Sequence, residues 1–281
     1  MQDYDAHHIK KRLGQNFLVN QGIVEKIVAS GSIGGNTGVI EIGAGKGALT
    51  RELARHAGKV LAIELDRDLV SGLISEFGDS PNVTVVQGDI LRLDLQALIG
   101  EHLDGSDIVV YGNLPYYITS SITMKLLESR LPFRSVVVMV QKEAAVRFTV
   151  EEGDRLMGAV TLAVRYFSEP HYLFTVSPGS FFPIPKVFSA VVRFDIRKEP
   201  PVHPNDEALM FRVIKVAFLQ RRKIISNSIG FGLNLMKADI LEVLDNAGID
   251  PLQRAEKLTL RDYAEISDSL YKLMPEMRTR K

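Results

Sequence analysis

The chain has 281 residues, enough for one large domain and one small one. Its composition, 46% hydrophobic and 24% charged, is typical of a soluble globular protein. It contains no cysteine, which excludes disulfide bonds and thiolate chemistry, and its six histidines show no metal-ligand spacing, so we predict no metal. The 34 basic and 34 acidic residues give no net charge, and no stretch approaches the roughly 18 apolar residues of a spanning helix, so we expect a cytoplasmic protein without membrane contact.

The amino-terminal region combines a basic cluster, an irregular polar segment and a helix. Lys10, Lys11 and Arg12 form a cluster that is able to bind phosphates, although a solvated face is the alternative. The segment 13–18 is too irregular for a core element and is either a lead-in to the helix or a lid over a ligand. Residues 20–31 carry apolar side chains at helical spacing and predict a helix.

Short β-branched runs then alternate with amphipathic segments. We predict strands at 39–42, 60–65, 83–87, 108–111 and 136–140, helices at 48–57, 69–77, 120–129 and 156–166, and two late strands, for which an antiparallel direction is left open, at 171–177 and 189–196. This alternation predicts an α/β fold with a mostly parallel, Rossmann-like sheet that has helices on both faces.

Three prolines between residues 200 and 204 mark a hinge. Beyond it we predict helices at 207–220, 237–246 and 260–273, so the chain divides into a catalytic domain, 1–199, and a small all-α domain, 200–281. We expect the cluster Arg221, Arg222 and Lys223 to bind nucleic acid, with a solvated face again as the alternative.

The ends of four predicted strands carry residues suited to a ligand, and in a parallel sheet these ends share one edge. The first strand ends in the glycine-rich turn Glu41-Ile42-Gly43-Ala44-Gly45-Lys46-Gly47, where the backbone can approach a ligand closely. The next three end in Glu64, Asp89 and Asn113. A nicotinamide-dependent enzyme needs the first two features but not Asn113-Leu114-Pro115-Tyr116.

Taken together, several motifs resemble one known family. These are Gly14-Gln15-Asn16-Phe17-Leu18, the glycine-rich turn, Glu64, Gly88-Asp89, Gly112-Asn113-Leu114-Pro115-Tyr116 and Phe181-Phe182-Pro183-Ile184-Pro185-Lys186-Val187. Over nearly the whole chain the sequence resembles the S-adenosylmethionine-dependent rRNA adenine N6,N6-dimethyltransferases, and within them the bacterial enzymes of 16S rRNA whose loss gives kasugamycin resistance. The resemblance implies a methyltransferase of the Rossmann-like class I fold, with S-adenosylmethionine as cofactor.

The resemblance also implies roles for individual residues. Asn16 and Leu18 would close over the cofactor, Gly43 and Gly45 would contact it, Glu64 would hold its ribose, Asp89 its adenine, and Asn113 would stand between cofactor and target base. Three residues depart from the family pattern, namely Ala44, Ile184 and Phe188. The last two affect the expected shape of the loop behind the target base.

The chemistry that follows is transfer of methyl groups to N6 of adenine. Asn113 and the carbonyl of Leu114 would accept the two N–H bonds of the target amine, Pro115 would fix the turn, and Tyr116 and Phe181 would stack on the flipped base. Simple core packing is the alternative for Phe181, and Tyr117 has no assigned role.

The expected substrate is a pair of adjacent adenines in a hairpin loop near the 3′ end of 16S rRNA in the small ribosomal subunit, with a role in its biogenesis, and the protein is expected to act as a monomer. The alternatives are a 23S rRNA methylase conferring macrolide resistance, a DNA adenine methylase, and a non-catalytic ribosome-assembly or transcription factor with the same fold.

Overall fold

The computed structural model describes residues 15–103 and 107–279, with side chains as far as residue 273. The chain divides into two compact units: the first runs up to Val146 and includes Glu169–Ile196, and the second comprises Arg147–Ser168 and the chain from Arg197 onward. The division at 199/200 expected from the prolines lies close to the crossing at Ile196. The crossing at Val146 was not predicted.

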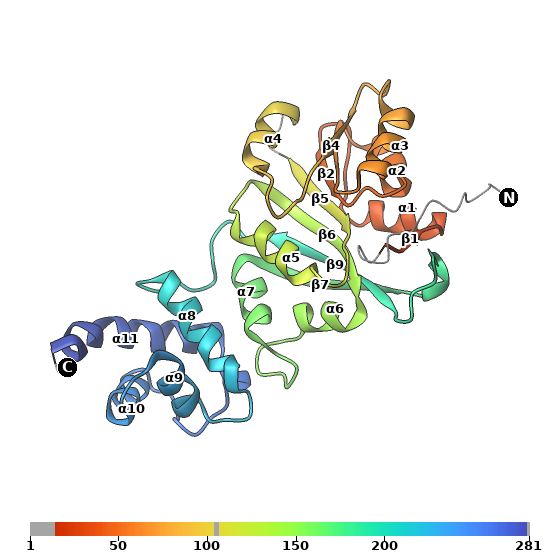
Figure 1. Cartoon of the computed structure of the whole chain (residues 1–281). Coiled ribbons are helices and arrows are strands. Elements are labelled where there is room, and N and C mark those ends of the chain that lie inside the picture. The colour runs from red at the N-terminus through yellow and green to blue at the C-terminus, as the bar shows by residue number, and fades with distance from the viewer. Residues whose placement is uncertain (1–14, 104–106, 280–281) are drawn as a thin grey trace. The chain divides into compact units, whose positions relative to one another are not determined.

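The first unit contains a seven-stranded sheet with the order β4-β3-β2-β5-β6-β9-β7 (Figure 1). The bounds of these strands are β2 (Gly38–Ile42), β3 (Lys59–Glu64), β4 (Val83–Gln87), β5 (Ile108–Asn113), β6 (Phe133–Gln141), β7 (Ser168–Val176) and β9 (Ser189–Ile196). The pairs from β4 to β6 are parallel, and β9 is antiparallel to β6. This confirms the predicted mostly parallel sheet, with each predicted strand close to its expected bounds.

Helices cover both faces of this sheet (Figure 1). The helices of this unit are α1 (Gln21–Ala29), α2 (Ala48–His56), α3 (Arg67–Phe77), α4 (Leu95–His102) and α5 (Thr119–Glu128), and α6 (Lys142–Thr149) begins in it and crosses its boundary at Val146. Successive residues of a strand point to opposite faces, so Val39 and Tyr111 share a core cluster with Ile27 of α1 and Leu53 of α2, while Ile40 and Val110 are equally buried on the other face. The sheet is therefore apolar on both sides.

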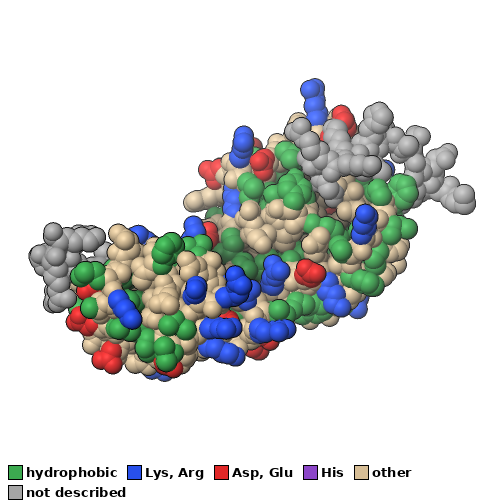
Figure 2. All heavy atoms as spheres, turned by 60° about the horizontal axis from the view of Figure 1, so that its bottom comes forward, with side chains coloured by type: hydrophobic (Ala, Val, Ile, Leu, Met, Phe, Trp, Pro, Cys, Tyr) green, Lys and Arg blue, Asp and Glu red, His purple; other side chains and the backbone are tan. Residues whose placement is uncertain are grey.

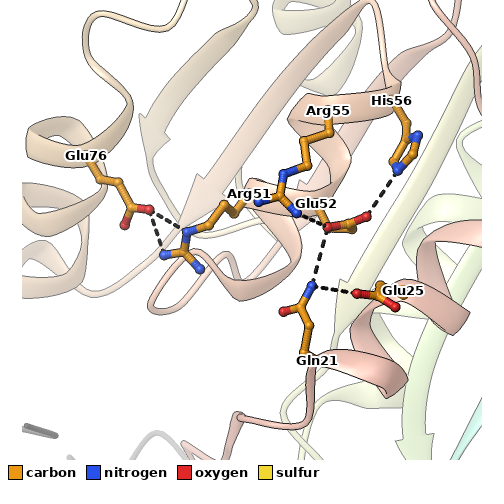
Figure 3. Close-up of polar contacts among 7 residues, drawn as sticks. All are labelled: Gln21, Glu25, Arg51, Glu52, Arg55, His56 and Glu76. Carbon is orange, nitrogen blue, oxygen red and sulfur yellow. Dashed lines mark hydrogen bonds and ion pairs between the residues drawn. The ribbon is translucent and has the colours of Figure 1, made fainter. Parts of the chain in front are cut away.

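Polar contacts on the surface connect α1, α2 and α3 (Figure 3). The carboxylate of Glu52 accepts hydrogen bonds from Gln21 of α1 at 3.4 Å and from Arg55 at 2.8 Å, and His56 Nε2 lies 3.1 Å from its other oxygen. Arg51 donates to Glu76 of α3 at 2.7 Å. These contacts hold neighbouring helices together at the surface.

The order of the strands places a crevice at one edge of the sheet. From β2 the chain proceeds outward to β3 and β4, then returns to β5 on the other side of β2 and continues outward to β6. The loops after β2 and β5 therefore leave the sheet in opposite directions, and this topological switch point is where ligands bind in open α/β sheets.

The second unit is helical around its own core. Its helices are α7 (Ala159–Phe167), α8 (Glu207–Ala217), α9 (Ile225–Leu233), α10 (Lys237–Asn246) and α11 (Leu260–Thr279). Met157, Leu162 and Tyr166 belong to the same buried cluster as Met210 and Tyr263, which explains why the segment 147–168 joins this unit. None of the helices in the described ranges has the length and hydropathy needed to cross a membrane.

Among the α-helices and strands of the described residues, five were not predicted: α4, α6, α9 and the short strands β1 (Phe17–Leu18) and β8 (Phe181–Phe182). The two short strands pair with each other antiparallel, Leu18 opposite Phe181 and Phe17 opposite Phe182. The sequence of α9 contains two glycines and two serines, which weakens the helical pattern, although its isoleucines at 225 and 229 are buried on one side.

Candidate active site

A cavity lies at the carboxyl edge of the sheet, where the crevice was expected. Its lining brings together Asn16, Leu18, Gly43, Gly45, Glu64, Asp89, Asn113, Leu114, Pro115 and Tyr116. The structure therefore places all the predicted cofactor-binding residues in one cavity, together with every predicted catalytic residue except Phe181.

The glycine-rich turn between β2 and α2 forms one wall. Gly43 and Gly45 have φ angles of 74° and 60°, in the left-handed region that a residue with a side chain rarely adopts. The turn is fixed because the backbone N–H groups of Gly43 and Ala44 donate to the carbonyl of Ile63 at 2.8 and 3.2 Å. The N-cap of the helix that follows is Gly47, which has no side chain to cap it, and within its first turn the backbone N–H of Thr50 is bonded to the buried carboxylate of Glu41.

Glu64 ends β3 and is held rigidly by backbone donors. One carboxylate oxygen accepts from the N–H of Gly45 and the other from the N–H of Asp66, both at 2.8 Å, and the residue is 8% exposed. A carboxylate offers about four acceptor positions, so two remain for a ligand. An oriented carboxylate with both oxygens available matches the two hydroxyls of a ribose.

Asp89 follows β4 and faces the same cavity. Its Oδ1 accepts from the N–H of Leu91 at 2.9 Å, and Arg92 lies 3.6 Å from Oδ2. The side chain is about one-third exposed, so an acceptor oxygen is accessible to an exocyclic amine. The residues at this edge therefore fit an adenosine-containing cofactor.

Asn113 ends β5, next to the glycine turn. Its amide Nδ2 donates to the backbone carbonyl of Asn16 at 3.1 Å, which turns the Oδ1 atom the other way. The N–H of Leu114 is used by the carbonyl of Met139 at 3.1 Å. Within the described ranges no hydrogen bond reaches Oδ1 of Asn113 or the carbonyl of Leu114, so both acceptors are available to an amine.

The turn after β5 positions an aromatic ring beside these acceptors. The Pro115 carbonyl accepts from the N–H of Ile118 and from the hydroxyl of Thr119, which leads the chain into α5. The hydroxyl of Tyr116 lies 2.8 Å from the hydroxyl of Ser189, at the start of β9. The Tyr116 ring is thereby anchored at its tip and lines the cavity with its body. Tyr117 also lines the cavity and is 61% exposed.

The segment before α1 lines part of the cavity, and its role as a lid remains a prediction. Gln15 donates to Asp66 at 3.1 Å, and Asn16, Phe17 and Leu18 all line the cavity. The ammonium of Lys46, in the glycine turn, lies 5.2 Å from the centre of the Phe17 ring.

Phe181 is placed differently from the sequence-based expectation. Its side chain is 2% exposed, it belongs to the core cluster that contains Leu18 and Val176, and it does not line the cavity. Core packing, the alternative interpretation, describes its position here because β8 pairs with β1 and turns this ring inward. The neighbouring Phe182 is 48% exposed.

The three residues of the predicted basic cluster 221–223 differ in their contacts. The guanidinium of Arg221 donates to the carbonyls of Arg155 and Met157 at 2.9 and 3.0 Å, so this side chain has a structural partner. Arg222 and Lys223 are exposed, and no side-chain bond to either occurs in the described part of the chain. Lys10, Lys11 and Arg12 lie outside the described residues.

Glu41 is a cavity residue that the sequence interpretation did not select. It lies in β2, is 1% exposed, and accepts a hydrogen bond from the hydroxyl of Thr50. Burial raises the pKa of its carboxyl to about 8, the bond from Thr50 counteracts part of this, and the nearby Glu64 adds to it. The sequence pattern that could have identified Glu41 is a single acidic residue inside an otherwise apolar predicted strand.

Comparisons with known proteins identify the same family. A family model described as ribosomal RNA adenine dimethylase matches residues 6–272. The ribosomal RNA small subunit methyltransferase A of Geobacillus sp. (strain WCH70) is 43% identical over 265 residues, 93% of this chain and 91% of that protein. The protein of the same name from Geobacillus thermodenitrificans is 44% identical, over 94% of this chain and 92% of that protein.

Two solved structures share the fold over most of the chain. The 23S rRNA methyltransferase ErmE superposes with a TM-score of 0.68 at 25% identity, and the match covers 91% of this chain and 100% of ErmE. A dimethyladenosine transferase from Plasmodium falciparum gives 0.76 at 24% identity, covering 93% and 98%. The predicted Rossmann-like methyltransferase fold is confirmed. Because the family model spans nearly the whole chain and relatives above 40% identity cover over nine-tenths of it, the chain belongs to the ribosomal RNA adenine dimethylase family.

Proposed function

We propose that the protein transfers methyl groups from S-adenosylmethionine to N6 of two adjacent adenines in a hairpin loop near the 3′ end of 16S rRNA, in the small ribosomal subunit. The product is N6,N6-dimethyladenine, and we expect the protein to act as a monomer in small-subunit biogenesis. The small-subunit substrate is supported by the names of relatives at 43% and 44% identity.

The observation that carries this proposal is the orientation of the Asn113 amide. The bond from Nδ2 to the Asn16 carbonyl leaves Oδ1 as an acceptor, the next residue carries the Leu114 carbonyl, and both residues line the cavity. Two adjacent acceptors with no adjacent donor match a primary amine, which has two N–H bonds to donate.

The cofactor of the family is S-adenosylmethionine, which supplies an electrophilic methyl group on a sulfonium when bound. Glu64 would hold the ribose hydroxyls, Asp89 would accept from the adenine amine, and the glycine turn would let the backbone approach the methionine end. These contacts would fix where the methyl group lies relative to Asn113.

The target amine needs activation because its lone pair is delocalised into the adenine ring. Accepting both N–H bonds at Asn113 Oδ1 and the Leu114 carbonyl would draw the nitrogen towards tetrahedral geometry and direct its lone pair at the methyl group. No strong base is required, since the proton becomes acidic only after methyl transfer. The Tyr116 ring would stack on the flipped base at about 1 to 3 kcal/mol. Phe181 would provide the opposite wall only if its ring leaves the core.

The proposal is tested with small ribosomal particles from cells that lack the modification and with labelled S-adenosylmethionine. We expect the protein to label the RNA, and mapping should place dimethyladenine at the two hairpin adenines. Large-subunit RNA and DNA are tested in parallel, and label in one of them instead would identify the protein as a 23S rRNA methylase or a DNA adenine methylase. If none of the three nucleic acids is labelled, the protein is a non-catalytic factor.

Asn113→Ala should abolish methyl transfer while binding of S-adenosylmethionine, measured by calorimetry, persists. The matched control is Asn36→Ala, because Asn36 is exposed and lies in the turn before β2, at the opposite edge of the sheet. Undiminished turnover of Asn113→Ala would refute the assigned role of the amide.

A further inference from the structure

A second cavity lies in the helical unit, between α9 and α10. Its lining includes Lys223, Asn227, Phe231 and Lys237, with Gly230 and Ile240 among the remaining residues. Its volume of about 350 Å³ is in the range of sites for small molecules. We call it the α9/α10 cavity.

The wall of this cavity holds an aromatic ring that the fold does not use. Phe231 is 74% exposed, although a phenylalanine of the helical core would be covered by its neighbours. At Gly230, one residue before it, an added Cβ would lie 3.5 Å from Ile240, so the two helices approach closely there. Phe231 therefore presents a flat apolar surface beside a rigid floor.

The charge around this ring is positive. Lys223 and Lys237 both line the cavity, Arg222 is exposed next to Lys223, and no carboxylate occurs among the described lining residues. Neither lysine forms an ion pair in the part of the chain that the structure describes. Asp239 is close in sequence but only 6% exposed and does not line the cavity.

The polar groups add a possible means of orienting a ligand. Asn227 is exposed, lines the cavity and carries an amide with both donors and an acceptor. The helix α10 begins beside the cavity at Lys237, and no side chain caps its first turn. Figure 2 shows exposed Lys and Arg side chains on the surface, and such cations are suited to contact phosphates.

We propose that the α9/α10 cavity binds one unpaired nucleotide of the RNA substrate, with its base stacked on Phe231 and its flanking phosphates beside Lys223 and Lys237. An exposed ring among unpaired cations matches single-stranded RNA, because bases stack on aromatic side chains while cations follow the backbone. A base-paired helix would not offer its base faces to the ring. This inference rests on the proposed function, since it adds a second contact for the same RNA.

The chain offers a sensitive test because it contains no tryptophan. Phe231→Trp in the full-length protein creates a single tryptophan, in the cavity, whose emission can be excited apart from that of the eight tyrosines, and stacking of a base should quench it. The control Leu252→Trp places the fluorophore on the same unit at a residue that is 69% exposed and outside the cavity. The probes are a short single-stranded oligoadenylate and the same RNA annealed to its complement.

We expect the oligoadenylate to quench the Phe231→Trp protein saturably, less so at high salt, and to leave the Leu252→Trp protein unchanged. The duplex should quench neither. Phe231→Ala should weaken binding of the oligoadenylate about 5- to 150-fold, the loss of one stacking contact. Leu252→Ala should bind as the wild type does, and circular dichroism verifies that each variant is folded.

Absence of quenching in the Phe231→Trp protein, or equal quenching in the control, would overturn the proposal. Unchanged affinity of Phe231→Ala would do so as well. These outcomes are independent of the proposed function, because a protein that does not methylate ribosomal particles can still quench, and a protein that methylates them can fail to quench.

Discussion

The buried carboxyl of Glu41 leads to a prediction about stability. Because its pKa is about 8 in the folded protein and 4.5 without the fold, the folded chain keeps a proton that the unfolded chain has already lost. The contribution of Glu41 to stability is therefore complete below about pH 4.5 and is lost as the pH rises towards 8. Glu41→Gln removes this titration while it keeps an oxygen that accepts from Thr50.

The size of the effect follows from the shift. Each pKa unit corresponds to about 1.4 kcal/mol, so the wild type should lose about 3 kcal/mol of this contribution by pH 7 and about 5 kcal/mol well above pH 8. Between pH 5 and pH 8 the stability difference should move by about 3 to 4 kcal/mol in favour of Glu41→Gln. Titrating groups distant from Glu41 contribute equally to both proteins and cancel in the comparison, whereas Glu64, whose charge acts on Glu41, does not cancel completely.

The assay is urea unfolding followed by far-UV circular dichroism at several pH values between 5 and 8, on the cofactor-free protein. The midpoint of the wild type should fall with pH more steeply than the midpoint of Glu41→Gln. If the two curves run parallel, Glu41 is ionised in the folded protein, and the argument from burial is wrong.

Two further predictions concern charged groups outside the cavity. Arg221→Gln should lower the free energy of unfolding, measured with urea, by about 1 to 3 kcal/mol, because the Arg221 guanidinium donates to two backbone carbonyls. Arg222→Gln should instead lower the affinity for RNA and the salt dependence of that affinity, both measured by filter binding. The reverse pattern in the two assays would contradict this assignment. Burial opposes ionisation of Glu52, but the hydrogen bonds from His56 and Arg55 outweigh burial and lower the pKa of its carboxyl (Figure 3). The contribution of Glu52 to the stability of the fold is therefore present above about pH 4.5 and is lost as the solution becomes more acidic. The thermal midpoint of Glu52→Gln should therefore change less than that of the wild type between pH 5 and pH 3, and an equal change would refute it.

The sequence was informative where one local pattern determines the structure. The strands β2, β3 and β5 are apolar runs, and burial on both faces requires such runs. Once these strands are parallel, their carboxyl ends share one edge, so Glu64, Asp89 and Asn113 had to approach one another. The cavity could be predicted for this reason before any distance was known.

The position of Phe181 depends on a pairing that the sequence does not display. Adjacent residues of a strand point to opposite sides, so one of Phe181 and Phe182 is turned inward and the other outward. The pairing of β8 with β1, more than 160 residues away, decides which, and it buries Phe181 at 2% and exposes Phe182 at 48%. Arg221 is a similar case, since its partners at Arg155 and Met157 come from the segment that the sequence assigned to the other domain.

A hydrogen bond connects the segment 15–18 to Asn113, the proposed acceptor for the target amine. Residue 16 contributes its backbone carbonyl to Asn113, and the adjacent Gln15 contacts Asp66 beyond the end of β3, while Val19 donates to the Ser180 carbonyl at 2.9 Å. A flipped Asn113 amide would lose its bond to Asn16 and set two oxygens against each other, at a cost of about 1 to 3 kcal/mol. The acceptor is therefore oriented before the RNA arrives, and the orientation depends on the same segment that lines the cofactor cavity.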